Sequence, residues 1–381
     1  MATCAPLAER CNADTRPAAP PPMTTMFGPF TMREVQHRIQ DQRRNPSLMA
    51  AARQPHDAGH LLWRDGEPVQ RLIDSMDRWI GCLLAEDGIE DAIEAEHDVA
   101  LMARTDGAIP SARVVARQEG IIAGIAVIER MIATWFPDLS CLAAVQDGDH
   151  ISADDVVLML QGAQNQMLCA ERTVLNILGR LSGLCTHANE LTRRTNKEIA
   201  ATRKTTWGVL DKWAVHLGGA LTHRLDRNEA MMIKENDAAN AAPGADSIER
   251  LRITLDARRF EAIAHSDPKV IWGRFLCIEV RSKSEAIEVG KWLENHKEED
   301  MPDVIMLIDN LGPKGTQNVV DALRSGKLCE HVVIEASGGI RPENVADWND
   351  VDVDVISMST LTQGVNAFDL SMLIDEVSEG V

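Results

Sequence analysis

Residues Ile199–Asn240 have the sequence IAATRKTTWGVLDKWAVHLGGALTHRLDRNEAMMIKENDAAN, and this one segment predicts most of the architecture. Its apolar runs at Ile199–Thr202 and Met231–Ile233 are separated by a helical stretch, so we expect a strand, a helix and a second strand. Its basic groups gather at the turns and strand ends: Arg203, Lys204, His223, Arg224 and Lys234. A solvated basic face is the alternative. A lysine directly after an apolar run is costly to bury without a negative partner, so we expect a pocket for an anion.

The same order of strand and helix repeats further along the chain. Four more short apolar runs follow, at Phe275–Val280, Val304–Ile308, Val332–Ile334 and Val355–Ser359. Helical patterns follow the first two at Ser284–Asn295 and Thr316–Ser325, and Pro342 is placed to begin another helix. The alternation predicts parallel strands with crossover helices. Polar residues recur where these strands end, which is where a (β/α) barrel keeps its site, although ordinary loop residues would produce the same pattern.

Composition limits the classes of function. The chain has 381 residues, enough for two domains, and 45% of them are hydrophobic. A net charge of −19 argues against a nucleic-acid binder, and no apolar run has membrane-spanning length. The eight cysteines form no CxxC motif or metal-like spacing, so reduced thiols are expected. We therefore expect small-molecule partners, no nucleic acid, no membrane and a cytoplasmic location.

The segment before the barrel divides into an arm and a second domain. Residues 1–60 contain seven Arg, no Lys and five acids, with a Pro-rich run, and we expect a disordered or appended arm. Import into an organelle through this arm is the alternative. Residues 61–170 predict a separate, mainly antiparallel α/β unit to which residues 366–381 return, leaving 171–365 as the barrel. The expected helices are Leu72–Leu84 and Gln164–Arg194. The expected strands are Ser111–Ala116, Gly120–Ala123 and Val156–Leu160.

Seven blocks in order resemble one family. They are AERTVLNILGRLSG (Ala170–Gly183), ATRKTTWG (Ala201–Gly208), GGALTHRLD (Gly218–Asp226), MIKEN (Met232–Asn236), IEVRS (Ile278–Ser282), MLIDN (Met306–Asn310) and IEASGGI (Ile334–Ile340). Over roughly 72–373 the chain resembles quinolinate phosphoribosyltransferase. The resemblance implies an α/β sandwich domain on an incomplete, TIM-like α/β barrel, assembled as a homodimer or a hexamer of dimers. It also implies transfer of phosphoribose from phosphoribosyl pyrophosphate to quinolinate with Mg²⁺, giving nicotinate mononucleotide, pyrophosphate and carbon dioxide in NAD biosynthesis.

The resemblance also assigns roles that suit the residue types. Several fixed cations are needed for two carboxylates, and arginine pairs with each of them through two hydrogen bonds. The implied quinolinate ligands are Arg203, His223, Arg224 and Lys234, with Arg172 entering from the neighbouring subunit. Lys204 would lie between substrate and pyrophosphate. Glu279 and Asp309 would stabilise positive charge on the ribose and approach magnesium indirectly. Small residues and backbone N–H groups would hold the 5′-phosphate: Ser337, Gly338, Gly339 and Ser359.

Three positions and one short segment depart from the family pattern. Asp237 replaces a histidine, and Trp207 replaces a proline, which we expect to loosen or reshape its turn. Ser359 replaces a glycine, and Glu90-Asp91-Ala92 replaces Gly-Asp-Thr. Two alternatives to the enzyme therefore stay open. One is a non-catalytic paralogue that binds a dicarboxylate or phosphorylated ligand. The other is a related phosphoribosyltransferase for another aromatic acid, which Asp237 would favour by repelling an anionic group.

Overall fold

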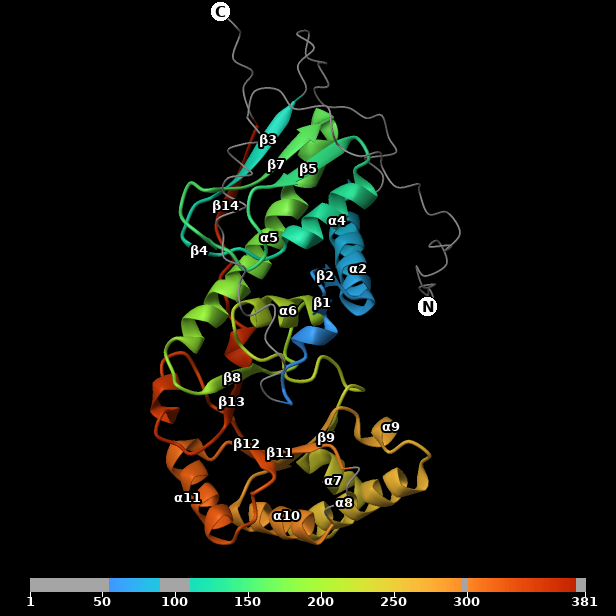
Figure 1. Cartoon of the computed structure of the whole chain (residues 1–381), viewed down its shortest axis with the longest axis vertical. Coiled ribbons are helices and arrows are strands. Elements are labelled where there is room, and N and C mark those ends of the chain that lie inside the picture. The colour runs from blue at the N-terminus through green and yellow to red at the C-terminus, as the bar shows by residue number, and fades with distance from the viewer. Residues whose placement is uncertain (1–54, 90–109, 297–300, 375–381) are drawn as a thin grey trace, which may run out of the picture. The chain divides into compact units, whose positions relative to one another are not determined.

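The computed structural model describes residues 55–89, 110–296 and 301–374 (Figure 1). Its larger sheet has six parallel strands in the order β8-β13-β12-β11-β10-β9. They are β8 (Glu198–Ala201), β9 (Met231–Ile233), β10 (Phe275–Val280), β11 (Asp303–Asp309), β12 (Val332–Ser337) and β13 (Val355–Met358). A single parallel bridge between Ala200 and Leu221 continues the order beyond β8. This arrangement agrees with the predicted barrel-like α/β fold.

Helices cover the outer face of this sheet. They are α7 (Glu235–Ala241), α8 (Ser247–Ala264), α9 (Lys269–Trp272), α10 (Lys283–Asn295) and α11 (Gly312–Ser325), whereas most buried residues of α6 (Val209–Leu217) belong to a different core. In β10, Leu276, Ile278 and Val280 pack in the core beneath the helices, whereas Phe275 and Cys277 belong to a separate inner cluster. Because side chains alternate along a strand, Glu279 points to the inner side as well. Figure 1 shows α8, α10 and α11 along one side of the sheet.

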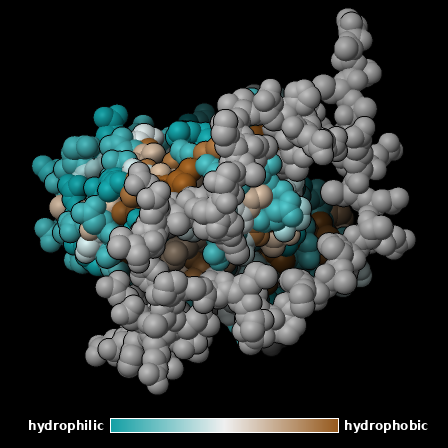
Figure 2. Space-filling model, turned by 90° about the horizontal axis from the view of Figure 1, so that it is seen from above, coloured by the Kyte–Doolittle hydropathy of each residue, from teal (hydrophilic) through white to brown (hydrophobic). Residues whose placement is uncertain are grey.

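The second sheet is antiparallel, in the order β14-β3-β7-β5. Its strands are β3 (Ser111–Ala116), β5 (Leu139–Ala143), β7 (Val156–Gly162) and β14 (Leu370–Ile374). Of the described helices, α6 packs in the same core together with α2 (Gln70–Glu86), α4 (Ile125–Trp135) and α5 (Gln164–Thr192). Two further sheets have two strands each: β1 (Trp63–Arg64) pairs with β2 (Glu67–Pro68), and β4 (Gly120–Ile121) pairs with β6 (His150–Ile151). Figure 2 shows hydrophobic residues gathered among hydrophilic ones on the face seen from above.

The chain returns to this second sheet at its end, because β14 pairs antiparallel with β3. Residues 375–381 and the segment Glu90-Asp91-Ala92 lie outside the described residues. In the described ranges, no helix has the length and apolar character needed to cross a membrane.

The region around Pro342 differs from the prediction. No α-helix begins there; the chain makes turns and then a short 3₁₀ helix, η4 (Val345–Trp348). Val345 and Trp348 are buried one turn apart, but the next buried residues, Val351 and Val353, are spaced by two. A spacing of two belongs to extended backbone, so the helix cannot continue.

The predicted arm is wrong at its end. Residues 1–54 lie outside the described part of the chain, but residues 55–60 are folded against the parallel sheet. His56 and Ala58 are fully buried, and η3 (Gly59–Leu61) follows directly. The Ala58 N–H donates to Thr222 Oγ1 at 2.8 Å, and this contact joins residues 164 positions apart. A composition shift marks a change of character, but it carries no information about such a distant contact.

Candidate active site

A cavity of about 610 Å³ opens at the carboxyl ends of the parallel strands. Eight of the twelve predicted site residues line it: Arg203, Lys204, His223, Arg224, Lys234, Glu279, Asp309 and Ser337. Arg172, Gly338, Gly339 and Ser359 are not among its lining residues. The eight come from six different strand ends and loops, and the parallel register brings them to one edge of the sheet.

Arg203 and Lys204 follow β8 and are exposed. Thr362 Oγ1 donates to the Lys204 carbonyl at 2.8 Å, which fixes the backbone of this turn. Among the described residues, neither the Arg203 guanidinium nor the Lys204 ammonium has an ion-pair partner. Both charges are therefore available to an anion in the cavity.

Arg224 is the most enclosed cation of the cavity, with 7% of its surface exposed. Its guanidinium donates to the Ala230 carbonyl at 3.0 Å and to Met232 Sδ at 3.4 Å, and it meets no carboxylate among the described residues. Burial, followed by the charge of Arg203, lowers the pKa of Arg224. A buried charge without a counter-ion is unfavourable until an anion binds.

His223 does not serve as a cation. Its Nδ1 accepts from the Arg224 backbone N–H at 2.7 Å, so the ring proton is on Nε2, which lies 3.2 Å from Glu335 Oε2. Burial lowers the pKa of His223 to about 4 despite the neighbouring carboxylate. The residue is neutral at pH 7, which corrects the expected count of cationic groups. Its φ of 53° is unusual for a residue other than glycine, and such strain is concentrated at functional sites.

Lys234 pairs with an acid of the cavity. Its Nζ lies 2.6 Å from Glu279 Oε2. The lysine side chain is 47% exposed, so the expectation of a buried ammonium is wrong, although the expected negative partner is present. Arg281 Nε lies 3.5 Å from Glu279 Oε1 and 3.4 Å from Asp309 Oδ2, and Arg281 also pairs with Glu235. The two acids are thus held side by side by one arginine.

The turn after β12 is held close to β11. The Asn310 N–H donates to the Ser337 carbonyl at 2.8 Å. Gly338 has a φ of 89°, and a Cβ there would approach Asn310 N to 2.7 Å, so only glycine fits this position. Gly339 also has positive φ, but it faces open space. Ser359 begins the 3₁₀ helix η5 (Ser359–Leu361), and its carbonyl accepts from Thr362 N at 3.0 Å.

The departures from the family pattern have structural roles. Asp237 Oδ2 accepts from the Lys234 N–H at 3.1 Å, so it caps helix α7, and it does not line the cavity. Trp207 is 8% exposed and stacks on Trp79 with ring centroids 5.6 Å apart. The guanidinium carbon of Arg180 lies over the Trp207 ring, 5.1 Å from the ring centroid. Of the two expected effects at Trp207, loosening is wrong, because the indole is packed in the core.

Two groups of side chains at the site have donor atoms of the kind that bind metal ions. His56, His223 and Glu335 place donor atoms within 4.8 Å of one another. However, the tautomer of His223 puts a proton on the nitrogen that would face an ion, and the 2.8 Å between His56 Nε2 and Glu335 Oε2 is a hydrogen-bond distance. This trio fits a hydrogen-bond network. Glu279 and Asp309 offer the hard oxygen ligands that magnesium uses together with phosphates.

Sequence reasoning missed three residues of the site. Arg281 directly follows a strand, as Arg203 does, so the same rule would have found it. Glu335 lies inside β12, which the prediction ended at Ile334; an acid within an apolar run was the available signal. Glu335 is fully buried and lines the cavity. His56 gave no signal, because its position in the site depends on contacts with residues far along the chain.

Comparisons with known proteins agree with this geometry. The model of the quinolinate phosphoribosyl transferase N-terminal domain matches residues 101–182, and that of the C-terminal domain matches 184–373. A probable nicotinate-nucleotide pyrophosphorylase (carboxylating) of Archaeoglobus fulgidus is 34% identical over 268 residues, which is 68% of this chain and 93% of the relative. The chain belongs to the quinolinate phosphoribosyltransferase family. A protein of the same name from Methanothermobacter thermautotrophicus is 32% identical over 69% of this chain and 88% of its own.

Solved structures of the quinolinate phosphoribosyltransferase fold support the architecture. NadC from Streptococcus pyogenes has a TM-score of 0.63 at 23% identity, covering 80% of this chain and 98% of its own. The predicted family, α/β fold class and assignment as a phosphoribosyltransferase are thus confirmed.

Proposed function

We propose that the cavity joins quinolinate to phosphoribosyl pyrophosphate, with loss of carbon dioxide, to give nicotinate mononucleotide and pyrophosphate for NAD biosynthesis. The observation that carries this proposal is the positive charge of Arg224. Within the described part of the chain it is buried without a carboxylate partner, and the cations of Arg203 and Lys204, which line the same cavity, have no ion-pair partner either. Quinolinate carries two carboxylates on one planar ring, and the planar guanidinium groups suit them. The names of the archaeal relatives support the same activity.

The acids of the cavity suit the bond that breaks. Loss of pyrophosphate from ribose C1 builds positive charge on the sugar, and nearby carboxylates stabilise that charge. Glu279 and Asp309 end neighbouring strands and share Arg281, so their oxygens lie close together. Lys204 then faces the anionic leaving group, while Arg203, Arg224 and Lys234 orient the ring nitrogen toward C1. Departure of the second carboxylate as carbon dioxide leaves an electron pair on the ring carbon beside the cationic nitrogen.

We propose that magnesium enters with phosphoribosyl pyrophosphate, near Glu279 and Asp309. When bound, the ion neutralises charge on the departing pyrophosphate. The chain's own contribution is to hold both acids in position: Lys234 and Arg281 are the cations that contact them. The 5′-phosphate would bind at Ser337, Gly338, Gly339 and Ser359; the open space at Gly339 supports close approach of a phosphate.

Arg172 is proposed to act in a neighbouring copy of the chain. Its side chain is 62% exposed on α5, lies only 3.9 Å from the adjacent Glu171, and does not line the cavity of its own chain. A homodimer or hexamer of dimers would bring it to a second cavity. Mixing Arg172→Ala and Lys204→Ala subunits tests this, because a shared site would restore part of the activity that each variant lacks.

Six free cysteines among the described residues support a reducing, cytoplasmic location.

The deciding experiment is an assay of nicotinate mononucleotide formed from quinolinate, phosphoribosyl pyrophosphate and magnesium. Product is expected from the wild type, with steep losses of turnover in Lys204→Ala and Glu279→Ala and no loss of folding. Quinolinate binding without product in the wild type would instead favour the non-catalytic paralogue. Product only from another aromatic acid would favour the related phosphoribosyltransferase.

A further inference from the structure

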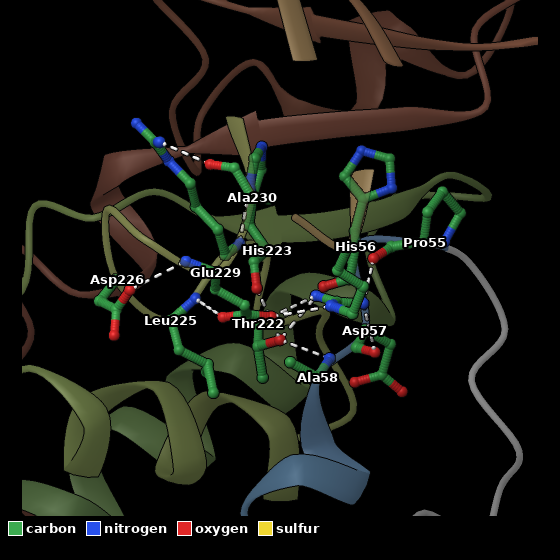
Figure 3. Close-up of polar contacts among 12 residues, drawn as sticks. Pro55, His56, Asp57, Ala58, Thr222, His223, Leu225, Asp226, Glu229 and Ala230 are labelled. Carbon is green, nitrogen blue, oxygen red and sulfur yellow. Dashed lines mark hydrogen bonds and ion pairs between the residues drawn. The ribbon is translucent and has the colours of Figure 1, made fainter. Parts of the chain in front are cut away.

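A short segment before the family match enters the site. We name Pro55–Ala58 the strap; it precedes the first residue matched by the family model, residue 101. The Arg274 guanidinium donates to the carbonyls of Pro55 and Asp57, the latter at 3.1 Å. Thr222 Oγ1 accepts from Ala58 N and lies 3.1 Å from the His56 carbonyl. Figure 3 shows His56, Asp57 and Ala58 beside Thr222 and His223. Both ends of the strap are therefore fixed to the parallel domain.

Contacts with His216 hold the strap in place as well. Asp57 Oδ1 lies 3.2 Å from His216 Nδ1 and accepts from the Gly59 N–H at 3.0 Å. A Cβ at Gly59 would approach the His216 ring to 2.1 Å, so the chain passes directly over that imidazole. The position of His56 is thus determined by its neighbours on both sides.

His56 meets the buried acid of the cavity. Its Nε2 lies 2.8 Å from Glu335 Oε2, and neither side chain is exposed. An ionised carboxylate only accepts hydrogen bonds, so His56 Nε2 carries the ring proton and is the hydrogen-bond donor. The same Glu335 oxygen accepts from His223 Nε2, while Glu335 Oε1 has no partner among the described residues. Burial would raise the pKa of Glu335, but its two imidazole partners lower it. Two N–H groups therefore compensate this buried charge, and His56 supplies one of them.

The hydrogen-bond network continues from Glu335 through His223 to Arg224, the cation proposed to bind the substrate. His223 donates to Glu335 through Nε2 and accepts from Arg224 N through Nδ1, so both its ring nitrogens are occupied. A change at Glu335 would free the His223 ring to rotate, and the Arg224 N–H would lose its acceptor. The direction of the Arg224 guanidinium depends on this backbone, which has strained geometry at the preceding residue.

We infer that His56 is a positioning residue of the active site: by donating to Glu335 it fixes the His223 tautomer and, through it, the Arg224 side chain that binds quinolinate. The identity of the ligand rests on the proposed function, whereas the contacts do not. The strap would then be a required part of the site supplied from outside the two matched domains.

Two variants of His56 separate positioning from packing. His56→Gln keeps an N–H donor near the position of Nε2, and His56→Leu fills similar space without a donor. We expect His56→Leu to raise the Kd and KM for quinolinate at least tenfold, with kcat and the KM for phosphoribosyl pyrophosphate changed less than threefold. His56→Gln should stay within threefold of the wild type. His60→Leu, at an exposed residue next to the strap, is the matched control and should change nothing.

The outcomes are distinct from a failure of the proposed function. Quinolinate binding is measured by calorimetry without phosphoribosyl pyrophosphate, so a wild type that binds without turnover would overturn the proposed function and leave this test intact. Unchanged binding in His56→Leu, or equal damage in both His56 variants, would overturn the inference. A further measurement uses no ligand and does not depend on whether a variant folds. In wild-type protein labelled with ¹⁵N-histidine, His223 must show protonated Nε2 and unprotonated Nδ1 at pH 7, and the opposite tautomer would refute the network.

Discussion

Replacing Arg224 by methionine should separate binding from stability. The guanidinium is 7% exposed and has one hydrogen bond to a carbonyl, at Ala230, with no carboxylate partner among the described residues. Methionine fills similar space without the charge. Loss of the hydrogen bond costs about 1.5 kcal/mol, and removal of an uncompensated buried charge offsets about as much or more. We therefore expect the free energy of unfolding of the ligand-free protein to stay within about 1 kcal/mol of the wild type, or to rise.

Binding should respond in the opposite direction. If the Arg224 guanidinium pairs with a quinolinate carboxylate in this enclosed position, its removal leaves the ligand's charge unpaired and costs about 2–5 kcal/mol. That is a loss of about thirtyfold or more in affinity. Urea denaturation measures the first quantity, and titration calorimetry with quinolinate measures the second.

The matched control is Arg227→Met, three residues away, because Arg227 is exposed and does not line the cavity. It should change neither quantity appreciably. The reasoning is refuted if Arg224→Met lowers the free energy of unfolding by more than about 2 kcal/mol, which would make the arginine structural. Wild-type affinity for quinolinate in this variant would refute the assigned role.

Three further predictions follow from single contacts. Trp207→Ala should lower the free energy of unfolding by about 3–5 kcal/mol, measured in urea, because it removes the buried ring that contacts Trp79 and Arg180; a loss below about 1 kcal/mol would contradict this. The folded-state pKa of His223 is lowered from 6.5 to about 4, so only the unfolded chain gains this proton as pH falls from 6.5 toward 4. The wild type should lose about 2 kcal/mol between pH 7 and 5 that His223→Asn retains, whereas the exposed-residue variant His265→Asn should behave as the wild type. Removal of magnesium with EDTA should abolish product formation without changing the Kd for quinolinate, and persisting turnover would argue against the proposed metal.

Parts of the site were predictable because they obey local rules. Arg203, Lys234, Glu279 and Asp309 each stand at the end of an apolar run, and parallel strands bring such ends to one edge. Arg281 obeys the same rule and was only left unassigned. Glu335 was not predicted as a site residue, because its acidic side chain follows an apolar run and suggested that the strand had ended. The strand continues through Glu335 to Ser337. A different aromatic acid was one alternative that Asp237 would favour, whereas its contact with Lys234 N shows a helix cap.

The sequence by itself determined the order of strands and helices, the family, and the gathering of charges at one end of the parallel sheet, because periodicity and strand-end chemistry are properties of neighbouring residues. Tertiary structure alone decided that residues 55–60 are folded and that His56 contacts Glu335, 279 positions away. It also decided that His223 is neutral, because the burial and hydrogen bonds that set its pKa come from distant parts of the chain. No pattern within a short window carries information about such contacts.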